Sequence, residues 1–125
     1  MRVRGIRGAT TVDSNTREAI LDATTELLEK MIEVNEVDVD EIASAFFSTS
    51  PDLNAEFPAV AARLSLGWDH TALSCMHEMD VPGSLPMCLR VMIHVNTNKR
   101  ADEVVHVYMR GARVLRPDLA FAPES

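Results

Sequence analysis

The sequence predicts a mixed α/β fold in which a mixed five-stranded sheet is covered on one face by one long amphipathic helix. Residues 88–97, CLRVMIHVNT, alternate between two sets of side chains, as a strand with one buried face does. Residues 15–38 instead repeat apolar side chains at helical spacing. Strand-like and helix-like segments are intermixed along the chain, which suits both short antiparallel connections and a helical crossover.

The first strand is predicted at residues 3–11, VRGIRGATT, where glycines leave room for a close approach to the backbone. The helix is expected to begin at a capping box formed by Asn15 and Glu18 and to run for about five turns. Acidic residues fill its outer side, the usual pattern of a solvent-exposed face. The apolar repeat consists of Ile20, Thr24, Leu27, Met31 and Val34, flanked by Leu21, Leu28 and Ile32.

The rest of the chain is expected to add three strands, a short helix and a loop. The strands are predicted at residues 41–50, 71–78 and 103–109, the short helix at 56–67 and the loop at 79–87. Gly67 is a typical helix end, and two prolines and a glycine break the loop. Within residues 88–97, Leu89, Val91, Ile93 and Val95 are predicted to share one face, and Cys88, Arg90, Met92 and His94 the other. Little chain remains to cover the second sheet face, so we expect the protein to form a homo-oligomer.

A chain of 125 residues is expected to form one domain, residues 1–125, with a flexible tail at about 117–125. Cys75 and Cys88 are its only cysteines and form no CxxC pattern, which favours a reducing cytoplasmic location. No apolar run has the length of a membrane span, and no apolar segment follows the N-terminal arginines as in a secretory signal. We therefore expect a cytoplasmic protein with no membrane contact.

The net charge of −7 argues against a nucleic-acid partner, which requires a basic surface. The charge is unevenly distributed, because residues 13–41 hold ten of the 19 acidic residues and only two basic ones. The remainder of the chain is nearly neutral. A local positive pocket is therefore compatible with an acidic protein.

The sequence contains no pattern of a metal, phosphate-loop or nucleophile site. His77 and Glu78 are adjacent on a predicted strand, so their side chains should point to opposite faces. What remains is arginine inside otherwise apolar strands, above all Arg7 and Arg90. Such arginines require partners, and two interpretations remain open. Arg90 forms an internal salt bridge, for example with Glu78, or the arginines form a carboxylate-binding pocket.

Four segments carry a resemblance to a known family. They are GIRGATTV at 5–12, SPDLNAEFPAVAAR at 50–63, SCMHEMDVPGSLPMCLRVMIHV at 74–95 and HVYMRGARVLRPDL at 106–119. Together they resemble the monofunctional chorismate mutases of the AroH class, from about residue 3 to residue 119. The resemblance implies a pseudo-α/β barrel formed as a homotrimer, with active sites at the subunit interfaces. It also implies conversion of chorismate to prephenate, a Claisen rearrangement in aromatic amino acid biosynthesis by the shikimate pathway, without cofactor or metal.

The resemblance also implies roles for individual residues. Arg90 would stabilise negative charge on the ether oxygen of the substrate, and Arg7 and Tyr108 would bind a substrate carboxylate. Glu78 would accept a hydrogen bond from the substrate hydroxyl, with Cys75 nearby. Apolar walls and a positive mouth would complete the site. The walls would be Phe57, Ala59, Leu73, Ser74 and Leu115, and the mouth would hold Arg63 and Arg116.

Two subunits would share each site. Phe57, Ala59 and Arg63 would come from one subunit, and Arg7, Cys75, Glu78, Arg90 and Tyr108 from its neighbour. Val60 departs from the pattern, because some relatives carry a lysine there at the pocket rim. The alternative function is a non-catalytic trimeric carboxylate-binding or regulatory module of the same architecture. The joint presence of Arg7, Glu78, Arg90 and Tyr108 favours the enzyme.

Overall fold

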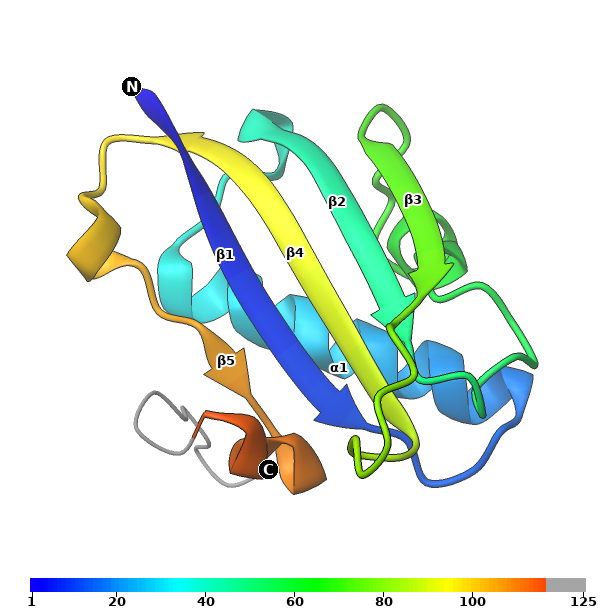
Figure 1. Ribbon diagram of the computed structural model, residues 1–125. Helices are drawn as coiled ribbons and strands as arrows, with labels where there is room; N and C mark the ends of the chain where they lie inside the picture. The colour runs from blue at the N-terminus through cyan, green and yellow to red at the C-terminus, as the bar shows by residue number, and fades with distance from the viewer. Residues whose placement is uncertain (117–125) are drawn as a thin grey trace.

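The computed structural model describes residues 1–116, so the tail predicted at 117–125 lies outside the described residues. Five strands and one long helix make up the fold, with short helical segments between them (Figure 1). The main elements are β1 (Arg2–Thr11), α1 (Arg17–Asn35), β2 (Ile42–Thr49), β3 (Ala72–His77), β4 (Cys88–Thr97) and β5 (Val107–Tyr108). The short segments are η1 (Val39–Glu41), η2 (Ala61–Ser65), η3 (Ala101–Glu103) and η4 (Arg110–Leu115).

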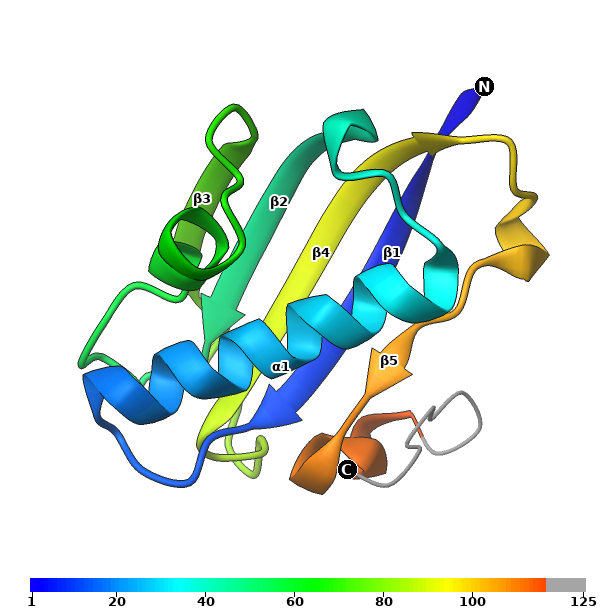
Figure 2. The ribbon, with the colours of Figure 1, turned by 180° about the vertical axis from the view of Figure 1, so that it is seen from behind.

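The strands form one sheet in the order β3-β2-β4-β1-β5. The central strand β4 pairs antiparallel with both β1 and β2, whereas the outer pairs β2–β3 and β1–β5 are parallel. Helix α1 crosses one face of this sheet, as Figure 2 shows from the helix side. The predicted mixed five-stranded sheet with one long covering helix is therefore confirmed.

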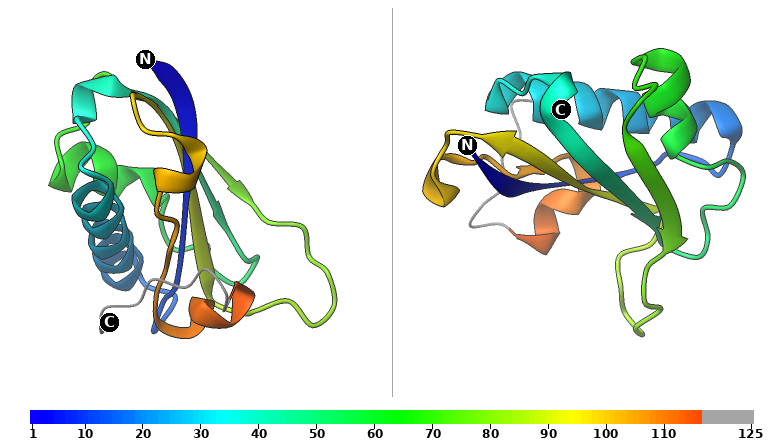
Figure 3. Two further views of the ribbon diagram at one scale, coloured as in Figure 1. Left: turned by 90° about the vertical axis from the view of Figure 1, so that its left-hand side faces the viewer. Right: turned by 90° about the horizontal axis from the view of Figure 1, so that it is seen from above.

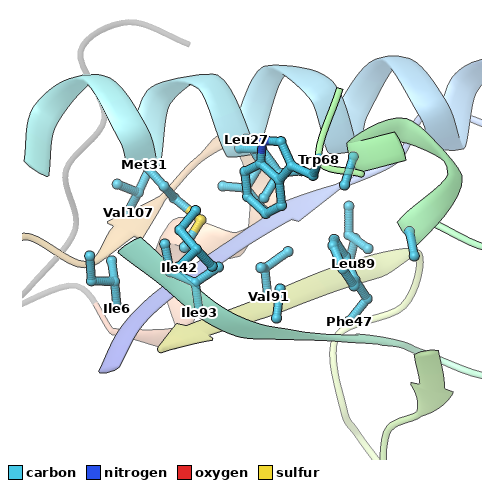
Figure 4. Packing of buried hydrophobic residues seen from close by; sticks show 14 of the residues in the cluster. Ile6, Leu27, Met31, Ile42, Phe47, Trp68, Leu89, Val91, Ile93 and Val107 are labelled. Atoms are coloured by element: carbon cyan, nitrogen blue, oxygen red, sulfur yellow. The ribbon is translucent and has the colours of Figure 1, made fainter. Parts of the chain in front are cut away.

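The core lies between α1 and the sheet. Ile20, Leu27 and Met31 of α1 are fully buried. Figure 4 shows Leu27 and Met31 facing apolar side chains of β4 and β5. The predicted apolar stripe is confirmed except at its end, where Val34 is only partly buried. Gly8 explains how close the layers come, because a Cβ atom there would overlap the sulfur of Met31. The glycine in this strand thus accommodates the helix.

The predicted capping box at the start of α1 is wrong. The N-cap is Thr16, whose Oγ1 accepts a hydrogen bond from the Ala19 N–H at 3.1 Å. Asn15 lies one residue outside the helix, and its Oδ1 accepts from the backbone N–H groups of Asn54 and Ala55, each at 3.0 Å. Threonine and asparagine are both good caps, and here the asparagine connects the helix start to a distant loop instead.

The fifth strand is shorter than predicted, because Asn35 binds the backbone ahead of it. The side chain of Asn35 donates to the Val105 carbonyl at 2.9 Å and accepts from the Val105 N–H at 2.8 Å. These groups are therefore not paired with a strand, and residues 101–103 form η3. The predicted strand at 103–109 is reduced to Val107 and Tyr108.

Residues 1–116 leave the middle of the second sheet face uncovered. Figure 3 (left) shows α1 on one side of the sheet, whereas the loop after β3 reaches out on the other side. Apolar side chains lie exposed on this open face, including Phe46, which is 41% exposed, and Met76, which is 47% exposed. The alternation predicted for β4 is confirmed on the core side, where Leu89, Val91, Ile93 and Val95 are buried.

Candidate active site

A hollow of about 330 Å³ lies on the open sheet face. It brings together Arg7, Glu78, Arg90 and Tyr108, which come from β1, the end of β3, β4 and β5. Other lining residues include Ala9, Phe46, Ser48 and Met92. Four of the residues that the sequence suggested for substrate contact therefore share one hollow.

The strand register places these side chains next to one another. Ala9 of β1 is paired with Arg90 of β4 on one side and with Tyr108 of β5 on the other. Ser48 of β2 is the partner of Arg90 across the next ladder. Residues paired across neighbouring strands point to the same face, so all four side chains line the open side. Ala9 lies between Arg90 and Tyr108 in this register and packs against Tyr108 and Ala112, with 2% of its surface exposed.

Arg90 and Glu78 form an ion pair across the hollow. Arg90 Nε lies 3.5 Å from Glu78 Oε2, and the same oxygen accepts a hydrogen bond from Ser48 Oγ at 2.8 Å. The Nε atom is buried and has no hydrogen-bond partner among the described residues. At 3.5 Å, with both side chains more than one-third exposed, this ion pair contributes little to stability. The predicted salt bridge is present, and both of its members still line the hollow.

His106 holds the backbone of Arg7. Its Nδ1 accepts a hydrogen bond from the Arg7 N–H at 3.0 Å, which requires an imidazole without a proton on that nitrogen. Burial lowers the pKa of His106, and the positive charges of Arg7 and Arg116 lower it further. The neutral ring thus fixes β1 at the residue whose side chain enters the hollow.

Stability should depend on pH through His106. Its pKa is lower in the folded than in the unfolded chain, so the unfolded chain binds the proton more readily. The contribution of the neutral ring is present above the ordinary pKa of 6.5 and is lost as pH falls through the folded-state value. Urea unfolding at about pH 7.5 and about pH 5 should show that wild type loses more stability than His106→Asn, which keeps an acceptor but does not titrate. Equal losses would contradict this assignment.

Tyr108 is the most buried of the four residues, with 4% of its surface exposed. It packs with Ala9 and with Ala112 of η4, and Leu85 and Leu115 lie against this small cluster. Leu115 therefore lies close to the hollow, as the sequence suggested, although it does not line it. The positive charge of Arg116 also lowers the pKa of His106, which is consistent with a position of Arg116 near His106.

Most of the remaining predicted residues line a second, shallow depression of about 440 Å³ beside β3. Its lining consists of Phe57, Ala59, Arg63, Thr71, Leu73 and Cys75. Leu73 and Cys75 pack against the core on the helix side of β3, whereas Ser74 alternates with them and is exposed. Burial raises the pKa of the Cys75 thiol, which favours its neutral form. Within one chain, Cys75 thus lies with Phe57 and Arg63, apart from Glu78 and Arg90.

Phe57 stands out in this depression, because 68% of its surface is exposed. Its backbone is held in place by Glu56, whose carboxylate accepts from the Phe57 N–H at 2.9 Å and from Arg17 Nε at 2.8 Å. These two donors lower the pKa of Glu56. Val60, the residue before η2, is buried, with 8% of its surface exposed, and so does not lie at an open rim of this chain.

The sequence did not reveal Ser48 and His106, which hold Glu78 and Arg7 in place. Neither residue stands out from its sequence neighbours. Each meets its partner, Glu78 or Arg7, only when segments distant in the sequence come together. Among residues 1–116 no three His, Cys, Asp or Glu side chains gather closely enough to hold a metal ion. No helix in that range is long and apolar enough to cross a membrane.

Comparison with known proteins gives a consistent result. A chorismate mutase named AroH from Bacillus subtilis is 48% identical over 120 residues, which cover 96% of this chain and 94% of the relative. An AroH from Thermus thermophilus is 49% identical over 121 residues, covering 96% and 98%. The solved structure of a chorismate mutase from Clostridium thermocellum is 53% identical, with a TM-score of 0.86 over 88% of this chain and 97% of that one. The family model for chorismate mutase type I matches residues 3–119, and the chain belongs to this family.

Proposed function

We propose that the chain, as a chorismate mutase, converts chorismate to prephenate in the hollow on its open face, within a homotrimer in which neighbouring chains complete each site. The observation that carries the proposal is the convergence of Arg7, Glu78, Arg90 and Tyr108 on one hollow. Two cations, one carboxylate and a phenol suit a substrate with two carboxylates and one hydroxyl.

The reaction needs a fixed positive charge more than it needs a proton donor. In the rearrangement the ether C–O bond breaks while a C–C bond forms within the same molecule, and no proton is transferred. Negative charge grows on the ether oxygen, so a cation aimed at that oxygen binds the transition state more strongly than the substrate. Arg90 supplies this cation, because its side chain lines the hollow and is 38% exposed there, while its Nε faces Glu78.

The other three residues orient the substrate. Arg7 and Tyr108 bind a carboxylate at the end of the hollow formed by β1 and β5. Glu78, held by Ser48, accepts a hydrogen bond from the substrate hydroxyl and keeps the guanidinium of Arg90 in place. Holding both ends of the molecule favours the compact conformer in which the reacting carbons lie close together.

The open face supports the homotrimer and the shared site. One chain leaves the hollow without the apolar wall that Phe57 and Ala59 provide, because these residues line a separate depression together with Arg63. Phe57, Phe46 and Met76 are exposed at positions where a monomer gains nothing from large apolar side chains. Packing the depression of one copy against the hollow of the next would bury these side chains and exclude water from the substrate.

The function is tested by mixing purified protein with chorismate and following the loss of chorismate absorbance and the formation of prephenate. We expect saturable turnover that a metal chelator does not change. Protein that is folded and trimeric but leaves chorismate unchanged would contradict the proposed activity. Binding of prephenate without turnover would identify the chain as the non-catalytic carboxylate-binding module instead.

A further inference from the structure

We propose that Glu26 of α1 and Arg110 of η4 form a strap that positions η4 beside the substrate hollow and thereby sets substrate affinity. The inference rests on the proposed function, because the hollow must be the substrate site for affinity to be the readout. Glu26 and Arg110 do not line the hollow, so both are positioning residues.

The strap is a two-pronged ion pair. Arg110 Nε donates to Glu26 Oε1 at 3.0 Å, and Arg110 Nη2 donates to Glu26 Oε2 at 3.1 Å. Parallel hydrogen bonds of this kind fix the orientation of both side chains, which a single contact does not. Both side chains are 40% exposed, so the pair lies at the surface but is not fully hydrated. Its geometry is therefore suited to holding one element against another.

The strap joins two layers of the molecule. Glu26 lies on α1, on the covered side of the sheet, and Arg110 lies two residues after the end of the edge strand β5. Figure 3 (left) shows η4 at the lower end of the sheet, separated from α1 by the strands. The Arg110 guanidinium binds Glu26 of α1, so α1 supports the segment that packs against Tyr108.

The backbone at Arg110 adopts an unfavourable conformation. Its φ of 52° lies in the left-handed region, which an arginine adopts only with strain. Glycine would relieve the strain, yet the neighbouring glycine is Gly111, where a Cβ atom would lie 2.9 Å from Thr11 Cγ2. Gly111 is thus required because Thr11 leaves no room for a side chain there. The strained residue, Arg110, carries the side chain that binds Glu26.

The turn is coupled to the hollow through a short chain of contacts. The Met109 N–H donates to the Ala9 carbonyl at 2.9 Å, and the Ala112 N–H donates to the Met109 carbonyl at 3.0 Å. Ala112 and Leu115 pack with Tyr108, which lines the hollow. Tyr108 belongs to this cluster, whereas Arg90 and Glu78 come from β4 and the end of β3. Loss of the strap should therefore weaken binding at Tyr108 and leave the barrier at Arg90 nearly unchanged.

The test separates KM from kcat in two variants. Glu26→Gln removes the negative charge with little change in shape, and Arg110→Gly removes the guanidinium while relieving the backbone strain. We expect each variant to raise KM about three- to fivefold, which matches the energy of a surface ion pair, and to keep kcat within about twofold of wild type. The matched control is Lys30→Gln, which removes an exposed ion pair to Glu33 on the same helix and should leave KM unchanged.

Reversal of the charges decides between positioning and general stability. Glu26→Arg and Arg110→Glu should each raise KM further, because like charges then face each other. The double variant should bring KM back to within about twofold of wild type, since it restores an opposite-charge pair. Unchanged KM in Glu26→Gln and Arg110→Gly would overturn the strap. The strap would also be overturned if kcat fell by the same factor as KM rose and the double variant restored neither.

A failure of the proposed function would look different. Wild-type protein would then show no turnover in the same series, and hydrogen exchange would still report on the strap. The amides of Gly111 and Ala112 should exchange faster in Glu26→Gln than in wild type and in Lys30→Gln. Equal protection in all three proteins would overturn the strap regardless of activity.

Discussion

Replacing Arg90 by lysine is expected to lower kcat by a factor of roughly 10² to 10³ while leaving the fold intact. Lysine keeps the positive charge but lacks the planar fork, so it cannot contact the ether oxygen and a carboxylate in the same geometry. The fold should survive because the side chain is 38% exposed and its ion pair with Glu78 is long, at 3.5 Å. Steady-state kinetics on chorismate together with thermal unfolding of both proteins measures the two effects.

Arg100→Lys is the matched control for this experiment. Arg100 is an exposed arginine that pairs with Asp102 outside both hollows, and the same chemical change there should alter neither kcat nor unfolding. Near-normal turnover in Arg90→Lys would remove the electrostatic role proposed for Arg90. A large loss of folded protein would instead show that the residue is chiefly structural.

Replacing Phe46 by aspartate is expected to dissociate the proposed homotrimer and to lower activity by a factor of about 10² or more. Phe46 stands on the open face, 41% exposed, with its ring edge-to-face against His94 at 5.6 Å between centroids. A carboxylate there would have to be buried without a partner when copies pack together. The single chain should remain folded, because its core lies on the opposite side of the sheet.

Light scattering gives the deciding measurement, since Phe46 also lines the hollow and could affect turnover directly. The mass should fall from that of three chains to that of one, with an unchanged circular dichroism spectrum. Thr25→Asp, which places the same charge on α1 in the other layer, should stay trimeric and active. A wild-type monomer, or a Phe46→Asp variant of unchanged mass, would contradict the proposed assembly.

The sequence could predict most of the fold because its strongest patterns involve many residues at once. Strand β4 alternates over its whole length, and α1 repeats its apolar stripe over several turns, so no single competing contact changes either element. Where one residue decides, prediction fails. Asn35 shortens β5 by binding Val105, and Thr16 instead of Asn15 begins α1. Such choices depend on partners that are distant in the sequence.

The candidate site shows the same division. Alternation alone indicates that Arg7 and Arg90 interrupt apolar strands, but it does not indicate that Tyr108 faces them. That requires the register of β1 against both β4 and β5. The family resemblance, and not the periodicity, indicated that Tyr108 belongs to the same site. Neither source revealed Ser48 and His106, because a residue that holds another in place leaves no pattern in its own neighbourhood.

Gly8 has a consequence for how mutational data on this protein should be interpreted. It lies beside Arg7 and borders the hollow, yet any side chain there would collide with Met31 on the far side of the sheet. A side chain at this position would displace Met31 and Leu27 of α1, so any loss of activity would come from core packing and not from contact with a bound molecule. A saturation screen scored only by growth or turnover would therefore assign this glycine to the chemistry, although its constraint comes from the layer behind it.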